Sequence, residues 1–198
     1  FKDGKKLSDK STIDELKKLV NEKEQLLEAI GNDASVLKDA SDGLRNDKDF
    51  VLKAIRRNEY ALQYASDSLK NDKEFILKVL KIDGYSLEFA SDRLKGDKDV
   101  VLKAVKKEGY ALQYASERLR DDKDVVLTAI KNNRSALEFV SERLKNDKDF
   151  ISEVEKIKAE SYSFGDLEDD NNNSQSESSL NSNKLMESIS FATPIQVH

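Results

Sequence analysis

The sequence predicts an all-α fold, a solenoid-like stack of short helical hairpins with a 25-residue repeat. The first observation is that the stretch from Asn71 to Lys95 recurs, with substitutions, throughout residues 46–145. The second is a composition that favours helices, since Ala, Leu, Lys and Glu are common and the single proline is Pro194. The third is that charged and hydrophobic residues each make up 37% of the chain, as expected for repeats that each expose one face.

The N-terminal residues 1–20 are predicted to form a polar flank that leads into a helix. Apolar residues at helical spacing over 11–30 predict one helix or a broken pair, with Thr12 as N-cap and Glu15 as its capping-box partner. Residues 21–45 are interpreted as a degenerate capping repeat, because their leucines match those of later repeats while the aromatic positions are lost.

Four full repeats follow, each predicted to begin with an α-helix, and they cover residues 46–70, 71–95, 96–120 and 121–145. Asn46, Asn71 and Asp121 each precede an acidic residue by three positions, which predicts N-caps with capping boxes. Gly96 stands at the same position with weaker capping chemistry. In the first repeat, apolar residues cover a wide arc of the helix predicted over 47–58, so this helix must pack against more than one neighbour.

Each repeat is then predicted to turn and return through a shorter helix. Gly84 and Gly109 stand where helices commonly end in a left-handed residue. Glu59, at the equivalent position of the first repeat, would be strained in that conformation. The second helix, predicted over 60–66, is too short to be stable alone and depends on packing. Ser66 and its equivalents precede an acidic residue, which predicts that they cap a short turn.

The C-terminal part departs from the repeat. Residues 146–160 are predicted to form a capping helix, because the repeat opens again but then continues without its turn. Residues 161–198 are rich in Asp, Asn, Ser and Glu and predict an acidic, largely disordered tail. Apolar residues between 185 and 197 belong either to the edge of another domain, or to disordered chain, or to a peptide that docks on a partner.

Charge and composition restrict the classes of function. The net charge is −5, but the four full repeats carry +3 and residues 152–198 carry −6, so bulk charge does not favour nucleic-acid binding. Cysteine is absent, which excludes disulfides and thiolate metal sites and fits a reducing, cytoplasmic compartment. No apolar run is long enough to span a membrane. Because the chain begins at Phe1 rather than at a methionine, we expect it to be part of a longer or processed protein.

A family resemblance rests on two repeated stretches, ALQYASDSLKNDKEFILKVL at residues 61–80 and ALQYASERLRDDKDVVLTAI at residues 111–130. They resemble the tandem helical repeat family catalogued as domain of unknown function 4116, and the resemblance covers residues 46–150. The fourth repeat departs from the pattern at Ser135 and Phe139. The resemblance implies helical tandem repeats as found in bacterial and protist proteins, including large effector-like ones, which would act in a host cytosol. It implies no catalytic residue and no established ligand.

Patterns typical of enzymes and of cofactor or metal sites are missing from the sequence. The one histidine, His198, is the last residue, which argues against a catalytic triad or a metal cluster. There is no glycine-rich phosphate loop and no nucleophile elbow. The recurring NDKD stretch alternates oxygen ligands as a calcium loop does, but an apolar run interrupts it at once, so helix capping is the preferred interpretation. We therefore expect no enzymatic activity, no cofactor and no metal in this chain.

The predicted partner-binding surface is a ridge of aligned side chains, because stacking at a fixed period places equivalent residues in columns. One basic column contains Lys53, Lys78 and Lys103, a second contains Arg56, Lys81, Lys106 and Lys131, and an aromatic column contains Tyr60, Tyr85 and Tyr110. The basic columns either bind anions or form a solvated face, in which the pairs Asp49–Lys53, Glu74–Lys78 and Asp99–Lys103 neutralise the first column. The tyrosines either anchor a partner or pack against the next repeat. Four further aromatic residues are interpreted as core: Tyr64, Phe89, Tyr114 and Phe139.

Three functions remain open at this point. The leading prediction is a non-enzymatic protein-interaction scaffold within a larger protein, with an unidentified protein as partner. One alternative is an array whose basic columns bind anions, phosphoinositides or nucleic acid, and the other is a targeting or spacer module for an enzyme domain outside this chain. Nearly every recurring position packs or caps, so partner specificity is expected at positions free to vary, such as Lys81, Ile82, Asp83 and Glu88.

Overall fold

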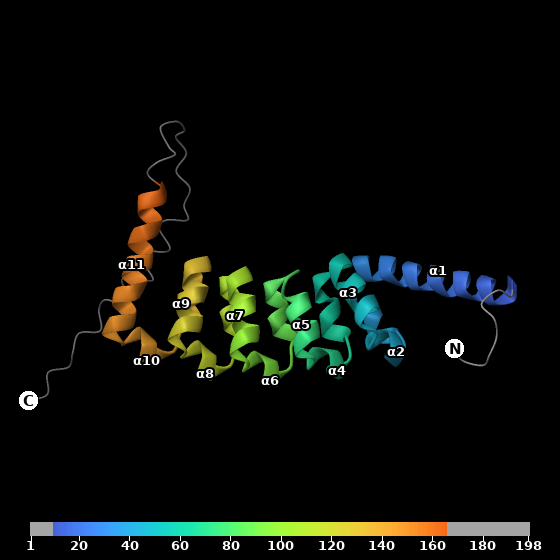
Figure 1. The fold of residues 1–198 in the computed structure, drawn as a ribbon, viewed down its shortest axis with the longest axis horizontal. Helices are drawn as coiled ribbons and strands as arrows, with labels where there is room; N and C mark the ends of the chain where they lie inside the picture. Colours follow the sequence, from blue (N-terminus) through green and yellow to red (C-terminus); the bar gives the residue numbers. More distant parts are fainter. Residues whose placement is uncertain (1–9, 166–198) are drawn as a thin grey trace, which may run out of the picture. The chain divides into compact units, whose positions relative to one another are not determined.

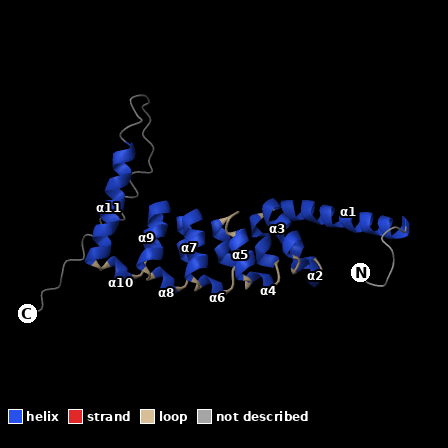
Figure 2. Cartoon of the chain, in the orientation of Figure 1, coloured by secondary structure: helices blue, strands red, loops and turns tan. Residues whose placement is uncertain are grey.

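The computed structural model describes residues 10–165, and these residues form α-helices and 3₁₀-helices without any strand (Figure 2). The predicted all-α fold with a 25-residue period is confirmed. The chain divides into two compact units, Phe1–Val140 and Ser141–His198, which are described separately below.

The first unit repeats a group of three elements: a longer α-helix, a 3₁₀-helix and a four-residue α-helix. The longer helices are α3 (Lys48–Arg57), α5 (Lys73–Val79), α7 (Lys98–Lys107) and α9 (Lys123–Asn132). The 3₁₀-helices are η2 (Glu59–Tyr64), η3 (Gly84–Phe89), η4 (Gly109–Tyr114) and η5 (Arg134–Phe139). The four-residue helices are α4 (Asp67–Lys70), α6 (Asp92–Lys95) and α8 (Glu117–Arg120). Figure 1 shows α3, α5, α7 and α9 side by side, with the short helices along one end of them.

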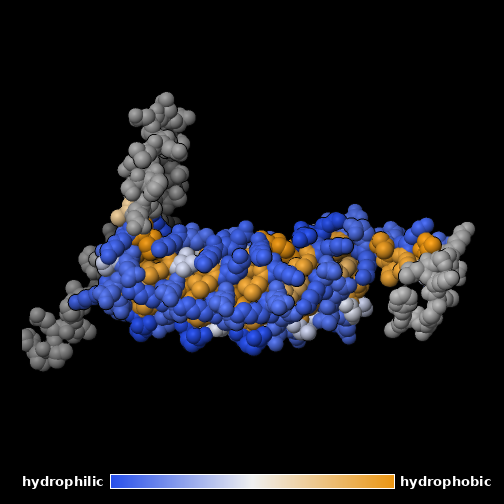
Figure 3. Space-filling model, in the orientation of Figure 1, coloured by the Kyte–Doolittle hydropathy of each residue, from blue (hydrophilic) through white to orange (hydrophobic). Residues whose placement is uncertain are grey.

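The N-terminal part of this unit consists of α1 (Lys10–Asn32), η1 (Ala34–Asp39) and α2 (Asp42–Arg45). The prediction of Thr12 as an N-cap is wrong, because Thr12 lies inside α1, which runs without a break. Neither glycine nor proline interrupts residues 11–30, so nothing in the sequence ends the helix there. The outer half of α1 leaves apolar side chains exposed at Ile13, Leu16, Leu19 and Val20, as the orange atoms on α1 in Figure 3 indicate.

The core lies between the longer helices and the 3₁₀-helices. In α3 the buried residues are Phe50, Val51, Ala54 and Ile55, and α7 and α9 bury the equivalent four positions. Each 3₁₀-helix adds a fully or almost fully buried leucine, such as Leu62 in η2. Burial of each large aliphatic side chain stabilises the fold by roughly 1.5 to 3 kcal/mol, which is the main force that holds these short elements in place.

The predicted helix starts are wrong by one residue. The N-caps are Asp47, Asp72, Asp97 and Asp122, whose carboxylates accept hydrogen bonds from backbone N–H groups of the first turn. Asn46 and Asn71 instead end the preceding short helices, with φ near −100° and ψ near 0°. The aspartate that follows has the extended backbone that an N-cap requires, which is why the cap moves one position along the chain.

The predicted role of the glycines is also wrong. Neither Gly84 nor Gly109 has a positive φ, and both begin a 3₁₀-helix rather than end an α-helix. A Cβ on Gly84 would lie 2.9 Å from the carbonyl oxygen of Ala104, in the next repeat. A Cβ on Gly109 would lie 2.8 Å from the backbone nitrogen of Asn133 and closer still to the carbonyl oxygen of Ala129. Glycine is needed here because the backbone of the next repeat approaches so closely.

The predicted second helix of each repeat is a six-residue 3₁₀-helix, followed by the one-turn α-helix that the serine caps. In α4, the Ser66 hydroxyl accepts a hydrogen bond from the Leu69 N–H at 3.2 Å, which confirms the predicted cap. The same hydroxyl donates to Asn46 Oδ1 at 2.6 Å, and the Ser66 N–H donates to the Arg45 carbonyl at 2.9 Å. Ser66 therefore caps its own helix and joins it to the preceding repeat, as Ser91 also does.

The repeat at residues 96–120 lacks part of this connection to the preceding repeat. The Ser91 hydroxyl donates to Asn71 Oδ1 at 2.8 Å, but Gly96 offers no side chain to Ser116. As a result, the buried Ser116 Oγ has no hydrogen-bond partner and makes no cap contact. A buried hydroxyl without a partner lowers stability by about 1 to 3 kcal/mol relative to a satisfied one.

A second set of joints consists of ion pairs between a lysine and the N-cap aspartate of the next repeat. Lys48 Nζ lies 2.6 Å from Asp72 Oδ2, and Lys73 Nζ lies 2.9 Å from Asp97 Oδ2. The pair Lys98–Asp122 repeats the latter distance, and Lys23–Asp47 is longer at 3.5 Å. The hydrogen bond from Lys48, followed by the Phe75 N–H, lowers the pKa of Asp72, and the same bond raises the pKa of Lys48.

The second unit contains α10 (Glu142–Lys145) and α11 (Lys148–Gly165). Ser141 caps α10 by accepting a hydrogen bond from the Leu144 N–H at 3.2 Å. The helix predicted to end near Glu160 continues to Gly165, because the residues between them contain no helix breaker until that glycine. The rest of the predicted tail, including the apolar residues between 185 and 197, lies outside the described residues.

Candidate functional site

The two basic columns lie on the longer helices, except that Lys81 follows the end of α5. Arg56, Lys81, Lys106 and Lys131 are all exposed near the C-terminal ends of these helices, where the helix dipole favours cations. In the other column, Lys53 and Lys78 are exposed and Lys103 is half-buried. None of these seven cations forms an ion pair within the described part of the chain.

The predicted neutralisation of the first column is wrong. The carboxylates of Asp49 and Glu74 form no ion pair with the lysines four residues on, and Asp99 accepts a hydrogen bond from Lys73 at 3.0 Å rather than from Lys103. Lys73 of the preceding repeat already binds the N-cap residue Asp97 at the start of α7. The carboxylate of Asp99 therefore lies within reach of the same lysine. The lysines of the first column are therefore not paired with the carboxylates of their own helices.

The three column tyrosines differ in exposure. The relative exposure of Tyr60 is 56% and that of Tyr85 is 40%, whereas Tyr110 is half-buried. Tyr60 lies edge-on to Phe89 of the next repeat with ring centroids 6.3 Å apart, and Tyr110 lies edge-on to Phe139 at 4.8 Å. The Tyr110 hydroxyl donates to Glu138 at 3.5 Å. Each of these two rings packs on a neighbour, and Tyr60 and Tyr85 also offer a large surface to solvent.

The four aromatic residues interpreted as core are only half-buried. Their rings lie at the margin of the core, since Leu62 and its equivalents, together with the alanines of the 3₁₀-helices, already fill the interior. Burial, followed by the hydrogen bond to Glu88, raises the pKa of Tyr114 to about 12. The 3₁₀-helices thus present a half-exposed aromatic surface with carboxylates around it.

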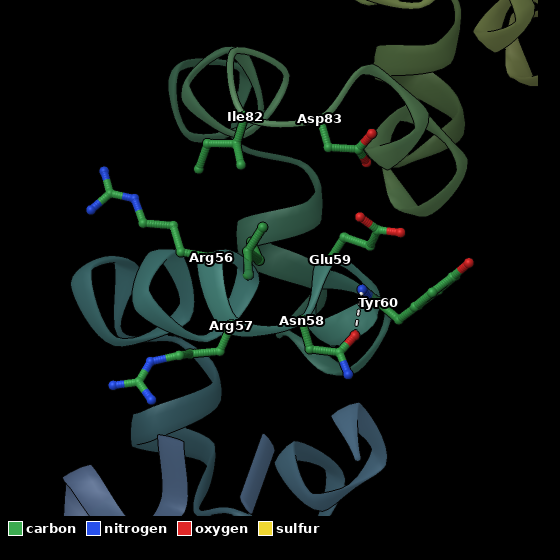
Figure 4. Close-up of a pocket in the computed structure, with 8 residues that line it drawn as sticks. Arg56, Arg57, Asn58, Glu59, Tyr60, Ile82 and Asp83 are labelled. Atoms are coloured by element: carbon green, nitrogen blue, oxygen red, sulfur yellow. Dashed lines mark hydrogen bonds between the residues drawn. The ribbon is translucent and has the colours of Figure 1, made fainter. Parts of the chain in front are cut away.

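A pocket of about 460 Å³ lies between the first and second full repeats. It is lined by residues 55–60 at the end of α3 and the start of η2, and by Ile82 and Asp83 after α5. Figure 4 shows the carboxylates of Glu59 and Asp83 on the same side as the Tyr60 ring, whereas Arg56 and Arg57 point the other way. Arg57 reaches Glu24 in α1 at 2.8 Å.

The pocket lies where the repeat is irregular. α5 ends at Val79, whereas α7 and α9 continue for three more residues at the equivalent positions. The Val79 carbonyl accepts from the N–H groups of both Ile82 and Asp83, at 2.8 and 3.1 Å, so the last turn has the tighter winding of a 3₁₀-helix. The residue that faces this turn is Glu59, where the next two repeats have glycine. At the equivalent position of the next two repeats, a Cβ would lie within 2.9 Å of the facing helix end, so Glu59 cannot approach α5 as closely as these glycines approach α7 and α9.

The described residues contain neither a metal-binding cluster nor a membrane-spanning helix. Residues 10–165 contain no group of three or more His, Cys, Asp or Glu side chains that could hold a metal ion. Over the same range, every helix is too short or too polar to cross a lipid bilayer.

The fold and its surface columns define the chain as a tandem helical-repeat protein. Five overlapping segments match the family described as "Domain of unknown function (DUF4116)", at residues 22–70, 47–95, 72–120, 97–142 and 122–168. Successive matches begin one 25-residue period apart, and together they span most of the sequence. The chain belongs to this family. Comparison with the curated proteins and with the solved structures found no match.

The structure brings only some of the predicted ridge residues together. Arg56 and Tyr60 line one pocket, whereas Lys131 lies at the far end of the first unit, on α9. Ile82 and Asp83, singled out as positions free to vary, also line the pocket. The contributions of Arg57 and Asn58 were not predicted. The signal that points to this place is Glu59, which interrupts a column that holds glycine in the next two repeats.

Proposed function

We propose that the repeat array is a non-enzymatic protein-interaction scaffold that binds a partner protein along its tyrosine column. The observation that carries this proposal is the exposure of Tyr60 and Tyr85, at 56% and 40%. The core of each full repeat buries its aliphatic residues, so these two rings are the exposed large hydrophobic side chains of described residues 46–140. Exposed aromatic residues on a rigid support are typical anchors of protein interfaces.

A scaffold of this kind needs a rigid surface, and the joints between repeats provide one. The ion pairs at the N-termini of the longer helices and the serine bonds at the short helices hold successive repeats in register. The tyrosines therefore stay at a fixed spacing, and a partner gains affinity because little conformational entropy is lost on binding.

A photo-crosslinking amino acid placed at position 60 or 85 tests the proposal in cell extract, with the exposed position 67 on α4 as control. We expect one partner to be captured at the two tyrosine positions and not at the control. The purified partner should then bind a Tyr60→Ser, Tyr85→Ser variant at least about tenfold more weakly, with unfolding unchanged. The same products from all three positions, or full affinity of the double variant, would contradict the proposal.

A second candidate function is anion binding through the basic columns. It is supported by the seven cations of these columns, which keep their charge because no carboxylate of the described residues pairs with them. Aligned cations attract polyanions such as phosphoinositide membranes or RNA, with a strength that falls as salt rises.

The triple variant Lys81→Glu, Lys106→Glu, Lys131→Glu tests this second function against liposomes that contain phosphoinositides and against RNA. We expect salt-dependent binding by the natural chain and its loss in the variant. Absent binding in both assays, or binding that the variant retains, would rule it out. The Tyr60→Ser, Tyr85→Ser variant is the matched control, because it leaves the basic columns intact.

A further inference from the structure

Tyr60 is held in place while much of its ring faces solvent. Asn58 Oδ1 accepts a hydrogen bond from the Tyr60 N–H at 3.2 Å, which fixes the backbone at the start of η2. The ring meets Phe89 edge-on, with an interplanar angle of 71°. More than half of the Tyr60 side chain remains exposed. A fixed aromatic ring of this kind can offer its electron-rich face to a ligand.

Carboxylates lie near this ring, and no cation among the described residues forms an ion pair with them. Glu59 is exposed and forms no hydrogen bond or ion pair within the described residues. Asp83 accepts from the Tyr85 N–H at 3.0 Å and from the Ser86 hydroxyl at 2.8 Å, and both of these donors are neutral. Glu88 lies immediately before Phe89, whose ring meets Tyr60. Its carboxylate accepts from the Tyr114 hydroxyl, which is also neutral, and Glu88 is exposed without an ion pair among the described residues.

The pocket separates these acids from the nearby arginines. In Figure 4, Glu59, Asp83 and Tyr60 form one side of the pocket, and the guanidinium groups of Arg56 and Arg57 extend from the other. Glu24 binds Arg57 from outside the pocket. The Tyr60 side is therefore an acidic aromatic surface, although the longer helices nearby are basic.

We propose that Tyr60, Glu59, Asp83 and Glu88 form a recognition site for a cationic side chain, arginine or lysine, on an extended segment of the partner. This deepens the proposed scaffold function and rests on it. A cation over an aromatic face is attracted by the negative potential of the ring, and the adjacent carboxylates add charge-assisted hydrogen bonds. Charge complementarity identifies the occupant, since an acidic or neutral segment would leave these three carboxylates without a cationic partner among the described residues.

The period of the array predicts the spacing of the cationic residues. Packed helices lie about 8 to 10 Å apart, and an extended segment advances about 3.3 Å per residue. Every third residue of the segment would thus meet the equivalent position of the next repeat. There Tyr85 keeps one of the three carboxylates, because Glu108 is the equivalent of Asp83 whereas Gly84 and Gln113 replace the other two. A second cation is therefore expected three residues from the first.

Labelled synthetic peptides test the site on the whole chain. The probe is a fluorescein-labelled peptide with arginine at every third position between serine and glycine, and the reference carries citrulline, which has the same shape without charge. Fluorescence anisotropy should show binding of the arginine peptide at least about tenfold tighter than the citrulline peptide. Equal binding of the two peptides, or no binding of the arginine peptide, would overturn the proposal.

Variants separate this site from general charge attraction. Glu59→Gln with Glu88→Gln should weaken binding of the arginine peptide about tenfold, and Tyr60→Leu should weaken it by a similar factor. Glu117→Gln on α8 is the matched control, because it removes an exposed carboxylate outside the site. A loss as large in Glu117→Gln as in Glu59→Gln would overturn the site. Free arginine that binds as tightly as the peptide would overturn the docking of an extended segment.

The two levels of the proposal fail in different ways. If crosslinking at positions 60 and 85 captures one partner but the arginine peptide does not bind, the scaffold function stands and the cation site is wrong. If the peptide binds but no partner is captured at these positions, the cation site stands and the scaffold function along the tyrosine column is wrong.

Discussion

The junction between α3 and α5 differs from the junction between α7 and α9, although the sequence repeats the same pattern at both. At the second, Gly109 lies against the last turn of α9, which continues to Asn132. At the first, Glu59 takes the glycine position, α5 ends early at Val79, and a pocket remains.

These two junctions differ at one position of the repeat. At Gly109, which has no Cβ, the backbones of two repeats meet closely. At Glu59, the facing helix α5 ends three residues early, and the side chains around the gap become available to a ligand. A single repeated framework thus supports both tight packing and a site.

The largest expected effect follows from opening the tight junction. Gly109→Ala places a Cβ 2.8 Å from the Asn133 backbone nitrogen and still nearer the Ala129 carbonyl, so the backbone must shift. We expect a loss of about 2 to 3 kcal/mol in the free energy of unfolding, measured by urea denaturation. Gly96→Ala is the control, because its Cβ would have ordinary contacts at 3.6 Å and should not destabilise the chain. Equal effects of the two substitutions would contradict the close approach.

The next prediction compares the N-terminal ends of α5 and α9, which lie opposite the ends where the two junctions differ. Asp72 caps α5 and Asp122 caps α9, each by accepting hydrogen bonds from backbone N–H groups. Asp72→Ala and Asp122→Ala should each reduce the free energy of unfolding by about 1 kcal/mol, by the same denaturation assay. A much larger loss at Asp122 would show that tight packing extends along the whole of α9.

Acid should weaken the ion pairs between repeats. The pKa of Asp72 is lowered by the Lys48 hydrogen bond and then by the Phe75 N–H, so the folded state holds the charged form more strongly than the unfolded state does. The stabilisation is complete above the unfolded pKa of about 3.9 and is lost as the pH falls through the lower folded value. Asp72→Asn, which keeps a capping oxygen, should therefore lose less stability than the natural chain between about pH 5 and pH 2.

A smaller effect, of opposite sign, should follow from completing the serine joint near the tight junction. Gly96→Asn offers an acceptor to the Ser116 hydroxyl, as Asn71 does for Ser91. The backbone of Gly96, with φ −97° and ψ −1°, matches that of Asn71, and its Cβ would lie 3.8 Å from Ser116 Oγ. We expect a gain of about 0.5 to 1 kcal/mol, seen as a higher Tm than that of Gly96→Ala. No gain over alanine would mean that the hydroxyl finds another partner.

The smallest expected change in stability comes from closing the open junction. Glu59→Gly removes the side chain that faces the end of α5, so the helix can continue past Val79 as α7 and α9 do at equivalent positions. We expect a change within about 0.5 kcal/mol, but slower amide hydrogen exchange from Leu80 to Asp83. Unchanged exchange would show that the sequence of α5 itself, rather than Glu59, ends the helix.

The sequence predicts the repeat and the core well, because both depend on periodic apolar residues that pack in the same way each time. Ser66 is also predicted correctly as a cap, since the hydroxyl and the N–H that it binds lie three residues apart in the chain. The N-cap was missed by one position, because Asn46 and Asp47 both have side chains that can cap and only the backbone conformation chooses between them.

The features that could not be predicted depend on distances between repeats. From its place in the sequence, Gly109 is predicted to be a left-handed residue that ends a helix. In the structure, its role depends on how closely α9 approaches it. The sequence suggests ion pairs within one helix, such as Asp49–Lys53, whereas the structure has ion pairs between repeats, such as Lys48–Asp72. For the same reason, Tyr60 is recognisable as a column residue, but the pocket beside it depends on the early end of α5.

The ion pairs between repeats have a consequence for how such a chain can change in length. Each joins a lysine to an aspartate in the next repeat at the same offset, as in Lys48–Asp72 and Lys73–Asp97. A gene duplication that inserts one whole repeat adds one complete ion pair and breaks none, whereas an insertion of any other length separates a lysine from its aspartate. Recombination between copies can therefore lengthen or shorten the array by whole units, and each product inherits a joint that already fits.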